Sequence, residues 1–168
     1  TEVVRAGDRA HTDIRWLDPR HSLSFGGHYD PANTHFGLLL VSNDDVVKAG
    51  QGFDTHPHQD MEIVTWVLEG SLVHQDSEGN NGILYPGLAQ RMSAGTGVVH
   101  SEFNHSKTEP VHFLQIWIEP NEAGKPGGYE EKHFDAASKT GRLRLVASPD
   151  GREGSVSMRQ DAFLYAAI

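Results

Sequence analysis

Short runs of β-forming residues, each closed by turn residues, constrain the fold of this chain more than any other feature. Glycine and proline, with 18 and 8 copies, are spread along the whole sequence as turn residues. Between them, β-branched, aromatic and aliphatic side chains form runs of strand length at 36–43, 62–70, 71–75, 98–103, 112–120, 143–148 and 163–168. Many short strands at close spacing predict an all-β sandwich or barrel. Helical structure is expected only as a short turn near 121–127 or 134–140.

Length, charge and hydropathy exclude several classes of protein. At about 150 residues per domain, the 168 residues correspond to one domain or one and a fraction. The sequence contains no apolar run of about 18 residues, so no membrane-spanning helix is predicted, and its first residues lack the apolar stretch of a signal peptide. A net charge of −9 disfavours direct binding to nucleic acid or to an anionic membrane, because both require clustered positive charge. A cytoplasmic location is compatible with the absence of cysteine.

The cysteine and histidine counts limit the chemistry of any bound metal. Zero cysteines exclude a disulfide scaffold, a cysteine nucleophile, an iron–sulfur cluster and thiolate zinc. The 11 histidines and 23 acidic residues leave imidazole and carboxylate as the metal ligands. Those ligands suit iron, nickel, manganese, copper or zinc.

Two pairs of residues have the spacing of a shared metal site. In an extended segment, residues i and i+2 point to the same side, so His56 and His58 can reach one ion, and so can His100 and Glu102. On neighbouring strands the two pairs would converge as three imidazoles and one carboxylate, with one or two positions left for water, substrate or O₂. One H-x-H pair proves little in a chain with 11 histidines, so the joint pattern carries the prediction.

The other candidates have simpler interpretations. His74 and His112 lie in predicted strands and are expected to pack in the barrel or line its mouth rather than bind metal. Phe113, Gln115 and Trp117 share one strand face. Core packing is the simpler interpretation of that face, and the lining of a substrate pocket is the alternative.

Two segments resemble the motifs of cupins. Residues 50–70, GQGFDTHPHQDMEIVTWVLEG, resemble the first cupin motif, and residues 86–104, PGLAQRMSAGTGVVHSEFN, resemble the second. The second segment departs from the general pattern, because Ser93 replaces its proline and His100 lies two residues later. These departures are typical of one branch, the pirins, and segments 16–31 and 111–120 also resemble pirins. The resemblance covers essentially the whole chain and implies a cupin fold, a jelly-roll barrel also called a double-stranded β-helix.

The pirin resemblance also implies a set of metal ligands. In pirins the ligands match His56, His58, His100 and Glu102, and the metal is usually iron. Fe(II) is therefore expected, with Ni, Mn, Cu, Co or Zn as alternatives. Glu62 matches the carboxylate ligand of the general cupin motif but not a pirin ligand. We therefore expect Glu62 beside the site, where it would fix the tautomer of an imidazole.

The resemblance implies functions of different classes. Bacterial pirins of this kind are associated with quercetin 2,3-dioxygenase activity, the oxidative opening of a flavonol ring with release of CO. Glu102 would then accept the hydroxyl proton of the flavonol or of another enolic phenol. Other pirins act as iron-dependent, redox-sensing regulators that bind a protein partner without turnover. A closed, purely structural metal site is the third interpretation.

The end of the sequence predicts an incomplete second domain. Pirins generally contain two cupins and are longer than 168 residues. Residues 1–138 resemble the N-terminal, metal-binding cupin, and residues 139–168 resemble the start of the second, so the expected fold is a truncated bicupin. The run 163–168 is apolar, and a strand there is expected to leave an unpaired edge that promotes association.

Overall fold

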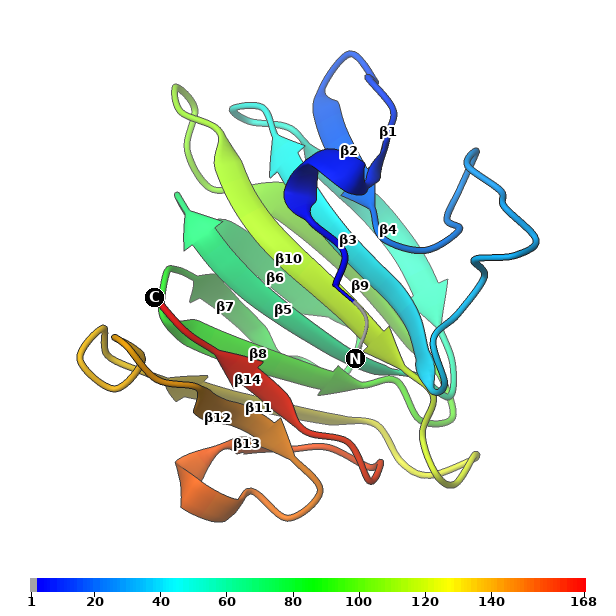
Figure 1. Ribbon diagram of the computed structural model, residues 1–168, viewed down its shortest axis with the longest axis vertical. Helices are drawn as coiled ribbons and strands as arrows, with labels where there is room; N and C mark the ends of the chain where they lie inside the picture. Colours follow the sequence, from blue (N-terminus) through cyan, green and yellow to red (C-terminus); the bar gives the residue numbers. More distant parts are fainter. Residues whose placement is uncertain (1–2) are drawn as a thin grey trace.

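The computed structural model describes residues 3–168 and consists almost entirely of β-strands (Figure 1). In chain order the strands are β1 (Ala10–His11), β2 (Leu17–His21), β3 (Leu39–Val47), β4 (Gly52–His58), β5 (Glu62–Glu69), β6 (Leu72–Asp76), β7 (Asn81–Leu84), β8 (Leu88–Ser93), β9 (Val98–Asn104), β10 (Val111–Ile118), β11 (Gly128–His133), β12 (Arg144–Ser148), β13 (Val156–Ser157) and β14 (Leu164–Ala166). The helices within residues 3–168 are two short 3-10 turns, η1 (Ala6–Asp8) and η2 (Arg152–Gly154). Neither is long and apolar enough to cross a membrane.

The helical turn expected from the sequence forms no helix. Residues 121–127 contain only bends and irregular backbone. Near 134–140 there is a single hydrogen-bonded turn, in which the Thr140 N–H donates to the Ala136 carbonyl at 3.0 Å and the Ser138 N–H donates to Asp135 Oδ1 at 2.7 Å. Gly141, with a φ of +67°, ends this turn before a helix can form.

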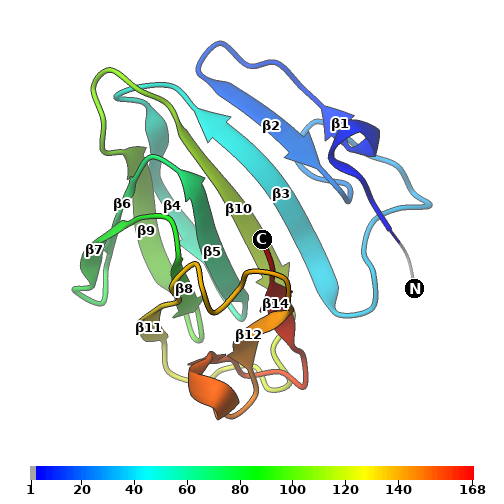
Figure 2. The same ribbon diagram turned by 60° about the vertical axis from the view of Figure 1, so that its left-hand side comes forward.

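Two facing sheets form the body of the fold (Figure 2). One has seven strands in the order β1-β2-β3-β10-β5-β8-β11, and the other has four in the order β4-β9-β6-β7. Neighbouring strands in both sheets are antiparallel. The core between them includes Val47, Leu72, Val111 and Phe113, each 0% exposed. This arrangement is the predicted jelly-roll sandwich.

Strand β9 shows how the sequence pattern selects the inner face. Val98, His100 and Glu102 are at most 3% exposed, whereas Val99 and Phe103 are 40% and 36% exposed. The period of two is that of a strand with one face on the core. The expectation that His100 and Glu102 share a face is therefore confirmed.

Strand β4 approaches β9 closely at Gly52. A Cβ atom at this position would lie 2.3 Å from the Glu102 carbonyl oxygen and 2.5 Å from the Phe103 Cα. Both distances are far below van der Waals contact, so the approach requires glycine. The same strand pairing carries His56 opposite His100, and Gly52 therefore helps to set the spacing of these two side chains.

The C-terminal strands form a small third sheet in the order β13-β12-β14. Glu130 on β11 connects it to the sandwich, since Glu130 Oε2 accepts the Ser157 N–H at 2.8 Å and the Ser157 Oγ–H at 2.7 Å. Burial raises the pKa of Glu130, but hydrogen bonds from Lys132 and Ser157 outweigh it and lower the pKa to about 2. Leu143, which precedes β12, and Tyr165 on β14 are exposed, at 73% and 53%.

Replacing Gly52 by alanine should lower the free energy of unfolding by about 1–3 kcal/mol, the usual cost of added volume at a packed position. The reason is that β4 must move away from β9. Gly27→Ala is the matched control, because an added Cβ there meets no atom within 4 Å. Urea unfolding followed by tryptophan fluorescence measures both variants. Equal losses in the two variants would contradict the close approach at Gly52.

The Glu130→Gln substitution should remove a pH-dependent contribution to stability. Because the folded-state pKa lies at about 2 rather than at 4.5, ionised Glu130 contributes fully above about pH 4.5, and its contribution disappears as the pH falls towards about 2. The variant should therefore be less stable than the parent protein near neutral pH, and the difference should shrink in acid. Urea unfolding at a series of pH values measures it, with Glu122→Gln in an exposed ion pair as control. A pH-independent difference would contradict this role.

Candidate metal centre

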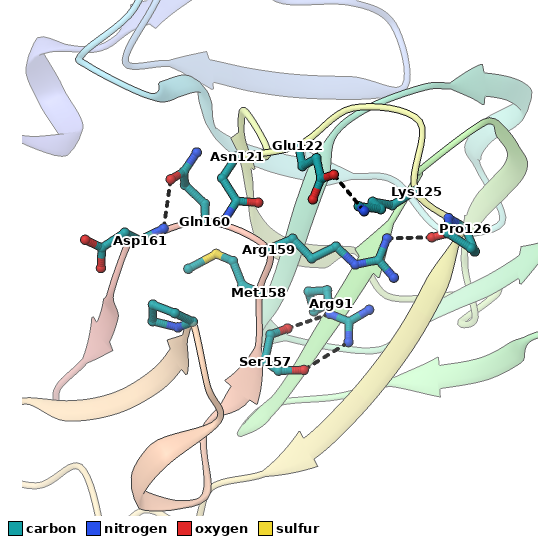
Figure 3. Close-up of a pocket in the computed structure, with 11 residues that line it drawn as sticks. Arg91, Asn121, Glu122, Lys125, Pro126, Ser157, Met158, Arg159, Gln160 and Asp161 are labelled. Carbon is teal, nitrogen blue, oxygen red and sulfur yellow. Dashed lines mark hydrogen bonds and ion pairs between the residues drawn. The ribbon is translucent and has the colours of Figure 1, made fainter.

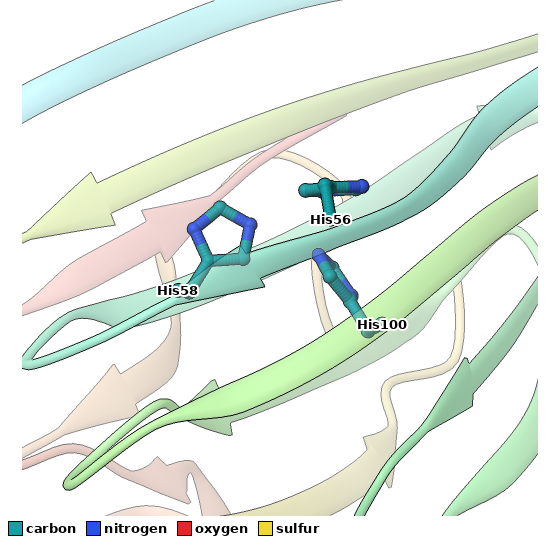
Figure 4. A group of neighbouring side chains, drawn as sticks. All are labelled: His56, His58 and His100. Carbon is teal, nitrogen blue, oxygen red and sulfur yellow. The ribbon is translucent and has the colours of Figure 1, made fainter.

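Three histidines converge between β4 and β9 (Figure 4). His56 and His58 come from β4 and His100 from β9, and their candidate ligand nitrogens lie within 4.8 Å of one another. The ring centroid of His100 is 4.4 Å from that of His56 and 4.8 Å from that of His58. The structure thus brings together the H-x-H pair and the histidine of the second pair.

Hydrogen bonds determine which nitrogens of this cluster are free. His56 Nδ1 lies 2.7 Å from the Asp54 carbonyl oxygen. Because a carbonyl only accepts, Nδ1 carries the proton and Nε2 keeps its lone pair. His100 Nε2 is buried and has no hydrogen-bond partner in the described chain. A buried nitrogen without a partner is costly, and a metal ion between these rings would satisfy it.

The protonation of the cluster also suits a metal. Burial and the neighbouring His56 lower the pKa of His58 to about 4. Burial and the surrounding histidines lower the pKa of His100 to about 3. Neutral imidazole is the form that binds metal. The donor set of imidazole nitrogens therefore fits a divalent ion of the kind that prefers nitrogen ligands.

Glu102 lies beside this cluster rather than within it. Its carboxylate forms a second group with His74 and His100, whose candidate ligand atoms lie within 4.8 Å of one another. The side chain is buried, and burial raises the pKa of Glu102 to about 7 against a smaller opposing effect of the Gln115 hydrogen bond. The two groups share His100, so each of the other three predicted ligands, His56, His58 and Glu102, has a candidate ligand atom within 4.8 Å of one on His100.

Gln115 and Trp117 on β10 hold the Glu102 carboxylate from the opposite sheet. Gln115 Nε2 donates to Glu102 Oε1 at 3.1 Å and to Oε2 at 2.9 Å. Trp117 Nε1 donates to Gln115 Oε1 at 3.1 Å, and because the indole N–H only donates, it fixes the orientation of the amide. Neither packing nor pocket lining, the two interpretations from the sequence, included this hydrogen-bonded role.

Sequence reasoning missed the partners of two buried side chains near His100. His74 Nε2 lies 3.0 Å from Asp76 Oδ2, and the two side chains are 0% and 1% exposed. Hydrogen bonds from His74 and Asn80 lower the pKa of Asp76, although burial acts in the opposite direction. The i, i+2 spacing of His74 and Asp76 in one strand is the signal that could have found the pair.

A second buried carboxyl group, which sequence reasoning also missed, lies on β3. Asp45 is 5% exposed, and its Oδ1 has no hydrogen-bond partner in the described chain. Burial, together with the nearby charges of Glu102 and Asp44, raises the pKa of Asp45 to about 7. The interior therefore contains more acidic groups than the ligand pattern alone requires.

The prediction that Glu62 fixes an imidazole is wrong. Glu62 is 1% exposed, and its Oε2 accepts the Ser93 Oγ–H at 2.8 Å and the Arg159 N–H at 3.2 Å. The residue begins β5 in the seven-stranded sheet, whereas the histidines belong to the four-stranded sheet. Its carboxylate therefore joins β5 and β8 to the C-terminal segment instead of supporting the metal centre.

A separate cleft of about 620 Å³ lies near this junction (Figure 3). Its walls include Arg91, whose Nε donates to the Ser157 carbonyl at 2.7 Å, and Arg159, whose Nη1 donates to the Pro126 carbonyl at 2.5 Å. None of the clustered histidines lines it. The cleft is therefore distinct from the candidate metal centre.

Comparison with known proteins identifies the family. The sequence profile of the Pirin family matches residues 3–118. The chain belongs to the pirin family. A quercetin 2,3-dioxygenase of Escherichia coli K12 is 52% identical over 161 residues, which cover 96% of this chain and 68% of that protein. A relative from Mycobacterium tuberculosis H37Rv is 53% identical over 162 residues, which cover 96% of this chain and 66% of the relative. The chain thus spans about two thirds of the length of these curated relatives.

Solved structures agree with this assignment. The crystal structure of YhhW from Escherichia coli matches with a TM-score of 0.90 and 52% identity, over 96% of this chain and 68% of that one. A second crystal structure, of the bacterial pirin YhhW in complex with nickel(II), matches with a TM-score of 0.89 and 50% identity over the same shares. The predicted pirin resemblance and cupin fold are therefore confirmed, and the histidine cluster and the nickel complex together support a divalent metal in this pirin.

Replacing Gln115 by leucine should lower the free energy of unfolding by about 1–3 kcal/mol, because it leaves buried polar groups of Glu102 and Trp117 without partners. Gln75→Leu, on the exposed face of β6, is the matched control and should change stability little. Chemical unfolding at neutral pH measures both variants. A Gln115→Leu protein as stable as the control would contradict the hydrogen-bonded role of Gln115.

Proposed function

We propose that this pirin is a metal-dependent dioxygenase that opens a flavonol or a related enolic phenol, with the metal bound by His56, His58, His100 and Glu102. The convergence of three imidazoles around the buried, unpartnered Nε2 of His100 is the observation that carries the proposal. The E. coli relative named as a quercetin 2,3-dioxygenase supports the substrate class.

A divalent metal bound there supplies Lewis acidity toward an enolate oxygen and, if it is redox-active, electron exchange with O₂. We expect Fe(II), and the nickel complex of YhhW supports a site of this type that also accepts Ni(II). The alternatives are Mn, Cu, Co and Zn, because imidazole suits copper and zinc and carboxylate oxygen suits manganese. Metal analysis of the protein as isolated distinguishes them.

The residues of this chain would contribute a proton acceptor and an apolar wall. We assign proton acceptance from the substrate hydroxyl to Glu102, because Gln115 holds both of its oxygens in one orientation. Trp117 lies edge-on to His58, with ring centroids 4.8 Å apart, and Phe53 lies 6.5 Å from His56. Aromatic rings beside the imidazoles suit a planar phenolic substrate and exclude water from it.

We further propose that residues 1–138 form the metal-binding cupin and that residues 139–168 begin a second cupin. The third sheet supports this division, because β12, β13 and β14 pair with one another and with no strand of the two larger sheets. Exposed Leu143 and Tyr165 on this segment also provide an apolar surface that further chain or another copy could cover.

The His56→Ala variant tests both the metal centre and the activity. Metal-free protein would be loaded anaerobically with Fe(II) or Ni(II), and the flavonol absorption band followed after air is admitted. We expect the parent protein to bind the metal and bleach the band, and the variant to lose at least about 10-fold in affinity, because one ligand is gone. His35→Ala, at an exposed loop position, should retain both properties.

A loaded protein that leaves the flavonol band unchanged would overturn the proposed activity. Metal binding without turnover would favour the second function, an iron-dependent regulator that binds a protein partner. Loss of folding in the His56→Ala variant, reported by its unfolding transition, would instead indicate a structural metal site.

A further inference from the structure

A buried chain of hydrogen bonds extends from the histidine cluster into strand β6. In the pairing of β6 with β9, Asp76 lies opposite His100 and His74 lies opposite Glu102. His74 Nε2 is 3.0 Å from Asp76 Oδ2, and His74 Nδ1 is 3.4 Å from His100 Nδ1. The order of contacts is therefore Asp76, His74, His100, and the last of these faces the other two histidines.

The surroundings of Asp76 make its carboxylate an acceptor. Asp76 Oδ1 accepts the backbone N–H groups of Glu78 at 3.0 Å and Asn80 at 2.9 Å, and Oδ2 accepts from Asn80 Nδ2 at 3.0 Å. An ionised carboxylate has no proton to donate. His74 must therefore place its proton on Nε2 to make the remaining contact.

The position of the His74 proton determines the tautomer of His100. In neutral His74 the single ring proton is the one on Nε2, and Nδ1 then has only a lone pair. His100 then has to donate from its own Nδ1, and its Nε2 keeps a lone pair. That same Nε2 is the buried atom without a partner, and it faces the space shared with His56 and His58.

We propose that Asp76 and His74 are positioning residues, which fix His100 with its proton on Nδ1 and its lone pair on Nε2, directed at the metal. We call the hydrogen-bonded series Asp76–His74–His100 the relay. Its role in metal binding rests on the proposed metal centre, whereas the tautomers of His74 and His100 are set in the metal-free protein. Both nitrogens of His74 are occupied by Asp76 and His100, so His74 itself is not a ligand. His56 reaches the same tautomer by a shorter route, through the Asp54 carbonyl.

The first test reads the tautomers directly. The metal-free protein would be labelled with ¹⁵N in its histidine rings, and two-bond ¹H–¹⁵N correlation spectra recorded near neutral pH. We expect the Nε2–H tautomer for His74 and the Nδ1–H tautomer for His100. A doubly protonated His74, or an Nε2–H tautomer at His100, would overturn the proposal.

The second test reverses the relay with Asp76→Asn. The turn N–H groups of Glu78 and Asn80 hold the Oδ1 position as an acceptor, so the new NH₂ group takes the place of Oδ2 and faces His74. His74 should then carry its proton on Nδ1, and His100 should switch to the Nε2–H tautomer. The Nε2 proton blocks the ligand atom, and Ni(II) affinity, measured by competition with a chelator, should fall about 10- to 100-fold.

Asp150→Asn is the matched control, because Asp150 also accepts a backbone N–H in a turn, that of Arg152 at 3.2 Å, away from the histidines. It should change neither the histidine tautomers nor the nickel affinity. An Asp76→Asn protein that keeps the parent tautomer of His100, or that keeps the parent affinity, would overturn the proposal. If the parent protein bound no nickel, the proposed metal centre would fail, while the tautomers of the metal-free parent would still decide the relay.

Discussion

The antiparallel pairing of β9 with β4 on one side and with β6 on the other is the constraint on which the candidate metal centre depends. Through it, His56 lies opposite His100, and Asp76 lies opposite the same residue on the far side. One row across three strands thus contains two proposed ligands, His56 and His100, and the carboxylate of Asp76, which we propose to position His100 through His74. Backbone hydrogen bonds fix which residues lie opposite one another in such a row, and a binding site requires its groups to be held within about 0.5 Å of the productive geometry.

The second constraint acts between the sheets rather than within one. Gln115 on β10 reaches across the interior to Glu102 on β9, and Trp117 fixes the direction of the Gln115 amide. Glu102 and Asp45 are both buried in this interior, and burial raises the pKa of each carboxyl group. Positive charge from a bound cation would offset the cost of burying them, so the acidic interior and the histidine cluster suit the same occupant.

The carboxylate at the general cupin ligand position has a different use in this pirin. Glu62 binds Ser93 and the backbone of Arg159, and Glu130 binds Ser157. Both carboxylates connect the sandwich to residues near the small C-terminal sheet. Ser93, which stands where the general motif has proline, supplies the hydroxyl that Glu62 binds, and the departure from the motif therefore has a structural counterpart.

Local patterns in the sequence determined the class of fold and indicated which residues form the candidate metal centre. Alternating and apolar runs identified strands such as β5, β9 and β10, and the i, i+2 spacing put His100 and Glu102 on one face, because side-chain direction in a strand depends only on the parity of the position. The apolar-run criterion could not identify β8 or β11, which lack such a run, because pairing with neighbouring strands rather than composition makes them strands.

Tertiary structure alone decided which groups on different strands meet. The position of Glu62 away from the imidazoles and the contacts of Gln115 with Glu102 and of His74 with His100 depend on strand order and on the facing of two sheets. These are contacts between residues distant in sequence, up to 97 positions apart for Glu62 and Arg159. Spacing along one strand gives the side on which a residue points, whereas its partner across the interior is fixed only when the whole sandwich closes.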